Sequence, residues 1–302
     1  MTPVLDQLGE KLAEKWVSAL ALPGLLFVGA SACAAVLGQD HALDAGLLIE
    51  KARHWAETVA HRPVVGQVTA VAVALLVAVA MGMFVRVCGE GAARVWTGDW
   101  PRPARRLARR VTARRAGVWG DLQRQIDGIR RDNPPYDRDD AHLRQITDLT
   151  ARRDRMGLSS PARPTYTGDR FAGVEGRLRG QYGIDLAACW PGLWLVLPEE
   201  VRAELRTTRA RFDAEVAGSV WACCYLVLGC FWWPAAVGGA AAGLVAWRRG
   251  RRAAAAHAGL AEAAVDVHLR RLAEEVGIAV PPGPTWDPRV GLLLNRLFRK
   301  GA

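Results

Sequence analysis

One stretch of 32 residues, 216–247, contains no charged side chain and is followed at once by the basic sequence RRGRR. The hydrocarbon core of a bilayer is ~30 Å thick, and about 20 apolar helical residues cross it. The stretch is therefore too long for one untilted span, and Pro234 near its middle interrupts helical hydrogen bonding. We expect a helical hairpin in a membrane, with one arm over 216–232 and the other over 235–247. A re-entrant loop that dips in from one face is the alternative.

Two further runs without charge precede this stretch, at 17–38 and at 64–85. The first begins after a segment that contains Glu and Lys and lacks a basic leader, so it does not have the pattern of a cleaved signal peptide. The second covers 22 residues and ends at Arg86. We predict that these runs form a first membrane pair, 17–38 with 64–87. The alternative for either run is the buried core helix of a soluble protein.

The charges between the apolar runs indicate an orientation. The segment 39–63 has 3 basic and 4 acidic residues, whereas 88–215 has 24 Arg against 18 acidic residues and 248–302 has 10 basic against 5 acidic residues. Basic residues near the ends of membrane segments mark the cytoplasmic side. We therefore expect 88–215 and 248–302 in the cytoplasm, and an even number of crossings between them. This places both termini in the cytoplasm and 39–63 outside the plasma membrane.

The sequence thus predicts an all-α integral membrane protein with four membrane segments in two pairs and a helical cytoplasmic domain. In the N-terminal residues 1–16 the apolar side chains recur at helical spacing and the other face is charged. This pattern predicts an amphipathic helix that lies on the membrane surface, with packing against a partner as the alternative. Breaks are expected at the NPPYD sequence, at Gly183 and at Gly277, because proline cannot continue a helix and glycine favours its C-terminal cap. The expected regions are 1–16 (surface helix), 17–87 (first pair with outer loop 39–63), 88–215 (Arg-rich cytoplasmic region), 216–247 (second hairpin) and 248–302 (cytoplasmic C-terminal helices).

Basic residues are concentrated beside the predicted membrane ends. The segment 101–117 has seven Arg and no acidic residue, and the chain carries a net charge of +10. A basic amphipathic helix next to a bilayer is typical of binding to anionic lipid headgroups. RNA is the alternative ligand, but no aromatic side chains are interleaved with these arginines, and we expect no nucleic acid partner. The candidate headgroup-binding residues are Arg105, Arg106, Arg109, Arg110, Arg248 and Arg249.

A dense apolar cluster at 189–197 lies within the otherwise charged cytoplasmic region. It predicts either packing inside the cytoplasmic domain or a surface on which a soluble partner docks, with Trp190, Trp194 and Leu195 as the candidate docking residues. In the predicted spans, uncharged polar side chains are the candidates for lining a pore, namely Gln67, Thr69 and Ser219.

Motifs that would carry catalysis are missing from the sequence. It contains no Walker A loop, nucleophile elbow, zinc-protease motif or C-x-x-C pair. Glu50, His54, Glu57 and His61 share one helical stripe, which we interpret as a solvated face rather than a metal site. The sequence therefore predicts a protein that is not an enzyme and that has no cofactor or metal ion. The predicted spans also lack charged residues, which lowers the expectation of ion-coupled transport.

A resemblance is carried by ARPTYTGDRFAGVEGRLRGQYGIDLAACWPGLWLVLPEEVRAEL, followed by FDAEV, FWWPA and EAAVDVHLRRLAEEVGI. Over roughly 150–278 the chain resembles a group of actinobacterial multi-pass membrane proteins. The resemblance implies lineage and membrane location and no activity. The order of pair, long cytoplasmic middle and pair is also similar in layout to bestrophin-type anion channels, but the neck and selectivity motifs of that family are absent.

Two functions are compatible with these features. The first is a membrane-anchored interaction or scaffold protein whose cytoplasmic helices receive a soluble partner. The second is an oligomeric membrane pore or channel, with an effector that a signal opens as one version of it. Gly239 and Gly243 form a small-xxx-small pair, which favours close helix packing within the hairpin or between copies in a homo-oligomer.

Overall fold

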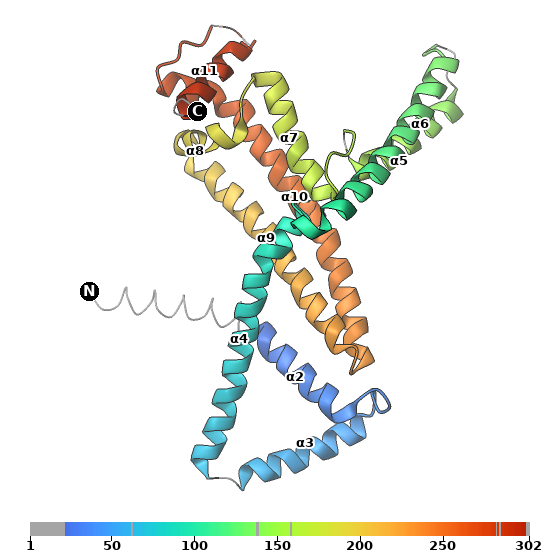
Figure 1. Ribbon diagram of the computed structural model, residues 1–302, viewed down its shortest axis with the longest axis vertical. Coiled ribbons are helices and arrows are strands. Elements are labelled where there is room, and N and C mark those ends of the chain that lie inside the picture. The colour runs from blue at the N-terminus through green and yellow to red at the C-terminus, as the bar shows by residue number, and fades with distance from the viewer. Residues whose placement is uncertain are drawn as a thin grey trace, which may run out of the picture. The chain divides into compact units, whose positions relative to one another are not determined.

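The computed structural model describes residues 22–61, 63–136, 139–157, 159–281, 283 and 285–299. The described part of the chain contains helices and no strands, which confirms the prediction of an all-α protein (Figure 1). The predicted surface helix at 1–16 and the start of the first apolar run lie outside the described residues. The α-helices are α2 (Leu22–Leu37), α3 (Ala45–Ala60), α4 (Val64–Trp96), α5 (Arg105–Asp132), α6 (Asp140–Met156), α7 (Tyr166–Tyr182), α8 (Leu186–Val196), α9 (Glu199–Leu228), α10 (Trp233–Glu275) and α11 (Pro288–Phe298), and the short 3-10 helix η2 (Arg102–Ala104) precedes α5.

Local sequence signals account for most helix ends. Asp44 caps α3, because its side chain accepts a hydrogen bond from the Leu47 amide. Gly183 follows α7 with φ of 70° and Gly277 follows α10 with φ of 76°, a left-handed conformation that glycine adopts without strain. The proline pair of NPPYD separates α5 from α6. The predicted breaks at these sites are therefore confirmed.

Three helices are longer than the sequence pattern suggests. Helix α4 continues past Arg86 to Trp96, and α5 joins the Arg-rich segment to the next amphipathic segment without a break. Helix α10 joins the second arm of the apolar hairpin to the basic C-terminal helix over 43 residues. The reason is that Arg and Ala are strong helix formers, so a change from apolar to basic composition does not end a helix.

The chain divides into two compact units. Unit 1 consists of 1–92 and 214–248, and unit 2 consists of 93–213 and 249–302. The boundaries lie close to the ends of the charge-free runs. Because α4, α9 and α10 each pass from one unit into the other, the chain crosses between the units within continuous helices rather than in loops.

Unit 1 is held together by small side chains. In the second apolar stretch, α9 ends at Leu228 and α10 begins at Trp233, so the predicted hairpin turn near Pro234 is present. A Cβ atom at Gly239 of α10 would lie 2.9 Å from the carbonyl oxygen of Ala222 in α9. The small-xxx-small pair thus serves packing inside the hairpin. At the crossing of α2 and α4, a Cβ atom at Gly24 would lie only 2.1 Å from the carbonyl oxygen of Ala78.

The loop after α2 is fastened to the tip of the hairpin. The Gln39 side-chain amide donates to the carbonyls of Gly229 (3.1 Å) and Cys230 (2.9 Å) and accepts from the Trp233 amide (3.1 Å). The Trp232 indole donates to the carbonyl of Ala42 at 2.9 Å. We call this set of contacts the tip clasp. Further back, Phe27 of α2 packs on Trp221 and Tyr225 of α9 with ring centroids 5.9 and 5.3 Å apart, so α2 and α9 run side by side in the same direction.

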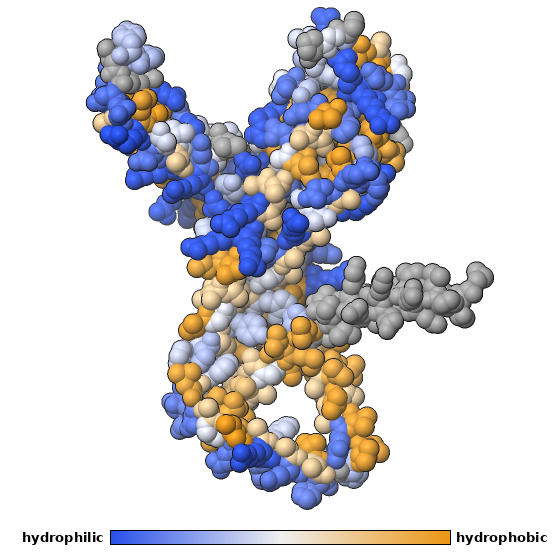
Figure 2. All heavy atoms as spheres, turned by 180° about the vertical axis from the view of Figure 1, so that it is seen from behind, coloured by the Kyte–Doolittle hydropathy of each residue, from blue (hydrophilic) through white to orange (hydrophobic). Residues whose placement is uncertain are grey.

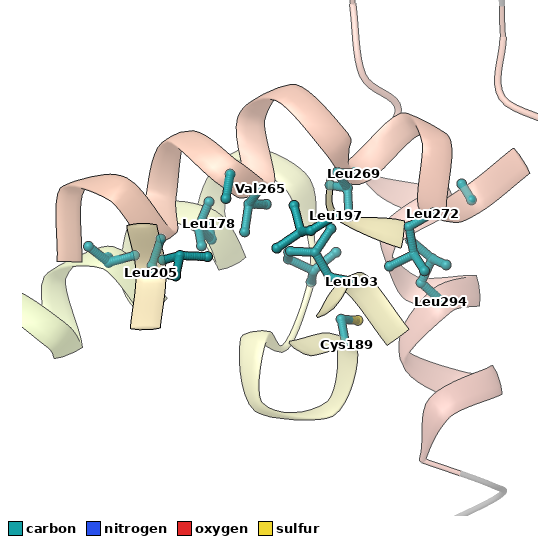
Figure 3. Packing of buried hydrophobic residues seen from close by; sticks show 14 of the residues in the cluster. Leu178, Cys189, Leu193, Leu197, Leu205, Val265, Leu269, Leu272 and Leu294 are labelled. Atoms are coloured by element: carbon teal, nitrogen blue, oxygen red, sulfur yellow. The ribbon is translucent and has the colours of Figure 1, made fainter. Parts of the chain in front are cut away.

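Unit 2 has a leucine-rich core made by α7, α8, α10, α11 and the first half of α9. Leu193 of α8 and Leu269 of α10 are both 1% exposed, and Leu294 of α11 is fully buried. Figure 3 shows these side chains pointing toward one another from helices that are far apart in the sequence. Burying each such side chain stabilises a fold by about 1.5–3 kcal/mol, so this core accounts for the packing of the C-terminal helices.

Helices α5 and α6 form a separate hairpin within unit 2 (Figure 1). Its base is fixed by Arg115, which pairs with the buried carboxylate of Asp169 at 2.5 Å and donates to the carbonyls of Arg163 and Met156. The other oxygen of Asp169 accepts from the backbone amides of Ala162 and Arg163. One buried carboxylate therefore holds α5, α7 and the linker between α6 and α7 in a fixed arrangement.

Candidate functional site

The surface of α4 is the first feature that points to function. Of the described helices, α4 is the one that is long and apolar enough to cross a membrane, and only 17% of its most apolar window is buried. A core helix of a soluble protein would be mostly covered by its own chain. Instead α4 presents large apolar side chains, with Val65 77% exposed and Leu76 68% exposed. Figure 2 shows hydrophobic residues gathered on the surface in the lower part of the view, where Figure 1 places α2 and α4.

The other apolar helices of unit 1 are shorter. Helix α2 has 16 described residues, and the apolar part of α9, 216–228, rises about 20 Å at 1.5 Å per residue. The arm of α10 before Arg248 is about as long. Each is short of the ~30 Å of a typical hydrocarbon core. The tip clasp joins the end of α2 to the turn of the hairpin, so these two elements end at the same level within unit 1.

The candidate pore residues are each hydrogen-bonded. Thr69 donates to the carbonyl of Val65 and Ser219 to that of Val216, both within their own helices. Gln67 donates to the carbonyl of Ala60, across the turn between α3 and α4. Each of the three side chains thus donates a hydrogen bond within the single chain, so its presence does not require a water-filled path.

The candidate docking residues divide between core and surface. Trp190 and Trp194 pack against the leucine core of unit 2 and against each other, with ring centroids 6.2 Å apart. Leu195 lies on the opposite side of α8 and is 78% exposed. On the neighbouring α11, Leu292 and Leu297 are also exposed. Of the three predicted docking residues, Leu195 is therefore the one whose side chain is available to a partner.

The predicted headgroup-binding arginines are all exposed: Arg105, Arg106, Arg109, Arg110, Arg248 and Arg249. The structure adds two residues that sequence reasoning missed. Arg102 of η2 and Arg163 of the linker lie beside Arg105 and Arg109 around one cavity. Arg163 is more than 50 positions away from Arg105 and Arg109 in the sequence, and no local pattern could have linked it to this site.

Two titratable groups near α8, Asp185 and Cys189, have structural roles. Asp185 caps α8 and pairs with Arg299, and this ion pair lowers the pKa of its carboxyl group. Burial raises the pKa of the Cys189 thiol to about 11, so at neutral pH the thiol is protonated and a poor nucleophile. Among the described residues, no group of three or more His, Cys, Asp or Glu side chains is placed to hold a metal ion. The stripe of Glu50, His54, Glu57 and His61 is exposed on α3.

Comparison of the chain with family models, with curated proteins and with solved structures finds no match.

Proposed function

We propose that this chain is a multi-pass plasma membrane protein that anchors a helical interaction domain, unit 2, at the cytoplasmic face. The observation that carries the proposal is the exposure of α4, whose apolar side chains are mostly left uncovered by the other described residues. Exposing such a surface to water is unfavourable by about 25 cal/mol per Å². Lipid removes that cost, and a bilayer is the environment for which a helix of this length and composition is suited.

In this proposal the hairpin of α9 and α10 crosses the bilayer twice instead of re-entering from one face. The support is the tip clasp together with the parallel course of α2 and α9. If α2 runs from the cytoplasm to the outside, then the hairpin tip, which contacts the loop after α2, also lies on the outer side. The Arg-rich sequence at 248–252 then returns to the cytoplasm, as the distribution of positive charge requires, and Arg248 and Arg249 meet the anionic headgroups.

A topology measurement tests the proposal. The other five cysteines are replaced by Ser or Ala, which leaves Cys230 at the exposed hairpin tip as the single thiol. A membrane-impermeant maleimide added to intact cells should label Cys230. A second single-cysteine variant, Leu195→Cys in unit 2, should be labelled only after the cells are opened. Labelling of both sites, or of neither, in intact cells would contradict the proposed topology.

The interaction role rests on the exposed leucines of α8 and α11 in unit 2. Large apolar side chains on a water-facing surface are typical of sites where another protein binds. Leu195→Asp should abolish recovery of the soluble partner while the protein stays folded in the membrane. Val267→Asp is the matched control, because Val267 on α10 is also strongly exposed, at 70%. Equal recovery with wild type and both variants would remove α8 as the docking surface.

An oligomeric pore is the second candidate function. It is favoured by the same exposed surface of α4 and by α3, on which no residue is buried by the part of the chain that the structure describes. A ring of copies would cover these helices as lipid does. The mass of the detergent-purified particle separates the two functions. A closed ring of four or more subunits that passes ions in liposomes would support the pore, and a monomer or dimer would contradict it.

A further inference from the structure

The cavity beside η2 and α5 is a preformed basic groove within unit 2. Its volume is about 1040 Å³, and it is lined by the loop after α4, by η2 and the first turns of α5, and by the linker 162–164. We call it the arginine groove. Ligand sites in proteins typically have volumes of about 300–1,000 Å³, so the space suits a bound molecule as well as solvent.

The walls of the arginine groove are fixed by buried contacts. On the linker side, Asp169 accepts from the amides of Ala162 and Arg163, and Thr165 donates to the carbonyl of Trp96 at 2.7 Å. At the end of the groove, Gly98 takes a φ of 83° and lies against Pro164 and Arg163, where a side chain would crowd the linker. A groove held open in this way requires little reorganisation to bind a ligand.

The charge around the groove is strongly unbalanced. Four arginines line it, namely Arg102, Arg105, Arg109 and Arg163, against one carboxylate, Asp99, which pairs with Arg163. In the described part of the chain, the ion pairs of α5 lie further along the helix, at Arg115 with Asp169 and Arg124 with Asp121. Among the groove residues, Arg102 of η2 and Arg105 and Arg109 of α5 are therefore three guanidinium groups that form no ion pair with a carboxylate of the described residues.

The spacing brings these three groups to one side of the helix. Arg102, Arg105 and Arg109 follow one another at intervals of three and four residues, which places them on the same face. The other residues of α5 that line the groove are small, namely Ala108, Thr112 and Ala113. The guanidinium groups thus surround a space that no bulky side chain fills. Trp100 and Pro101 add an apolar wall at one end.

We propose that the arginine groove binds a phosphorylated ligand, with Arg102, Arg105 and Arg109 contacting the phosphate and Trp100 contacting its apolar part. The planar guanidinium group donates two parallel hydrogen bonds to phosphate oxygens, and such charge-assisted bonds are about twice as strong as neutral ones. A phospholipid headgroup and a soluble phosphate ester present the same chemistry. The proposal does not depend on the partner role of unit 2 or on the number of membrane crossings.

The test compares two double variants of the full-length protein. Arg105→Gln with Arg109→Gln removes two charges from the groove. Arg114→Gln with Arg131→Gln removes two charges from α5 at exposed residues that do not line it and that are not among the candidate headgroup-binding residues. Glutamine is a good helix former, so both variants should fold, and their thermal melting in detergent checks this.

Binding is measured in two arms, which separate the two sources of phosphate. In the first arm, calorimetry measures the affinity of the protein for pyrophosphate, a soluble ligand. In the second arm, the affinity for nanodiscs of phosphatidylglycerol is compared with the affinity for nanodiscs of phosphatidylcholine, which measures binding of a lipid headgroup. In at least one arm the groove variant should bind at least about tenfold more weakly than wild type, because it loses two charge-assisted contacts to the phosphate. The control variant should retain wild-type affinity within about threefold, as expected for exposed charges.

Three results would overturn the proposal. The first is an equal loss of affinity in both variants, which would mean that only the overall charge of α5 matters. The second is unchanged affinity in the groove variant. The third is the absence of binding by wild-type protein in both arms. Binding in one arm alone identifies the source of the phosphate and supports the groove.

Discussion

The two units of this protein are packed in opposite ways. In unit 1 most of the buried residues are small, such as Gly24, Ala78 and Ala222, while many large valines and leucines are exposed. In unit 2 most of the buried hydrophobic residues are large, such as Leu193, Leu269 and Phe212, and the exposed surface is rich in arginine. Water drives large apolar side chains inward, whereas lipid does not, so helices in lipid associate through close backbone contact. The contrast supports the proposed placement of unit 1 in lipid and of unit 2 in water.

The largest effect is expected in the core of unit 2. Leu193→Ala leaves a cavity in a fully packed region and should lower the free energy of unfolding by about 2–5 kcal/mol. Leu195→Ala on the same helix should change it by less than about 0.5 kcal/mol, because the Leu195 side chain is already exposed. Thermal unfolding in detergent measures both. Equal destabilisation by the two variants would mean that α8 is not oriented as described.

A smaller loss is expected where α2 crosses α4 in unit 1. Gly24→Leu places a side chain against the Ala78 backbone and should destabilise the unit by about 1–3 kcal/mol, because the helices must separate. Gly29→Leu is the control, since a Cβ atom at Gly29 meets nothing within 4 Å. Size-exclusion profiles after heating in detergent compare the two. If both variants behave as wild type, small-residue packing does not hold unit 1 together.

The tip clasp should contribute about 1 kcal/mol, the net value of a few exposed hydrogen bonds. Gln39→Ala removes three contacts to the hairpin tip and should free the backbone of 229–233. Amide hydrogen exchange in that segment should then be faster. His41→Ala, in the same loop, should leave the exchange unchanged. Unaltered exchange in Gln39→Ala would show that the tip is held by other contacts.

The smallest effect concerns a histidine in unit 2. Burial lowers the pKa of His257 below 6.5, and its ring contacts Thr208 at 3.0 Å and Phe171, with Arg209 and Asp213 nearby. Below pH 6.5 the unfolded chain binds more protons at this position than the folded chain, so stability falls as the pH falls. The loss at pH 6 should be under about 1 kcal/mol. His257→Asn should flatten the profile between pH 6.5 and 5, measured by thermal unfolding. If the slope of stability against pH is the same in His257→Asn and wild type, groups other than His257 cause the pH dependence.

Much of the helical framework was predictable from local chemistry. The breaks at NPPYD, Gly183 and Gly277 follow from the conformations that proline and glycine allow. The helical hairpin at 216–247 follows from its apolar length and from Pro234. The fusion of the apolar and basic segments in α4 and α10 was not predicted, because the sequence marks a change of environment there but contains no residue that ends a helix.

The sequence by itself determined that this protein is helical and where its apolar and basic segments lie, because these properties depend on residues that are neighbours in the chain. Only the tertiary structure decided which side chains meet. It packed the half-buried Trp190 and Trp194 against the core and left Leu195 exposed. It also brought Arg163 to the first turns of α5 and fastened Gln39 to the hairpin tip some 190 residues away. Such contacts depend on packing between helices, which no local pattern specifies.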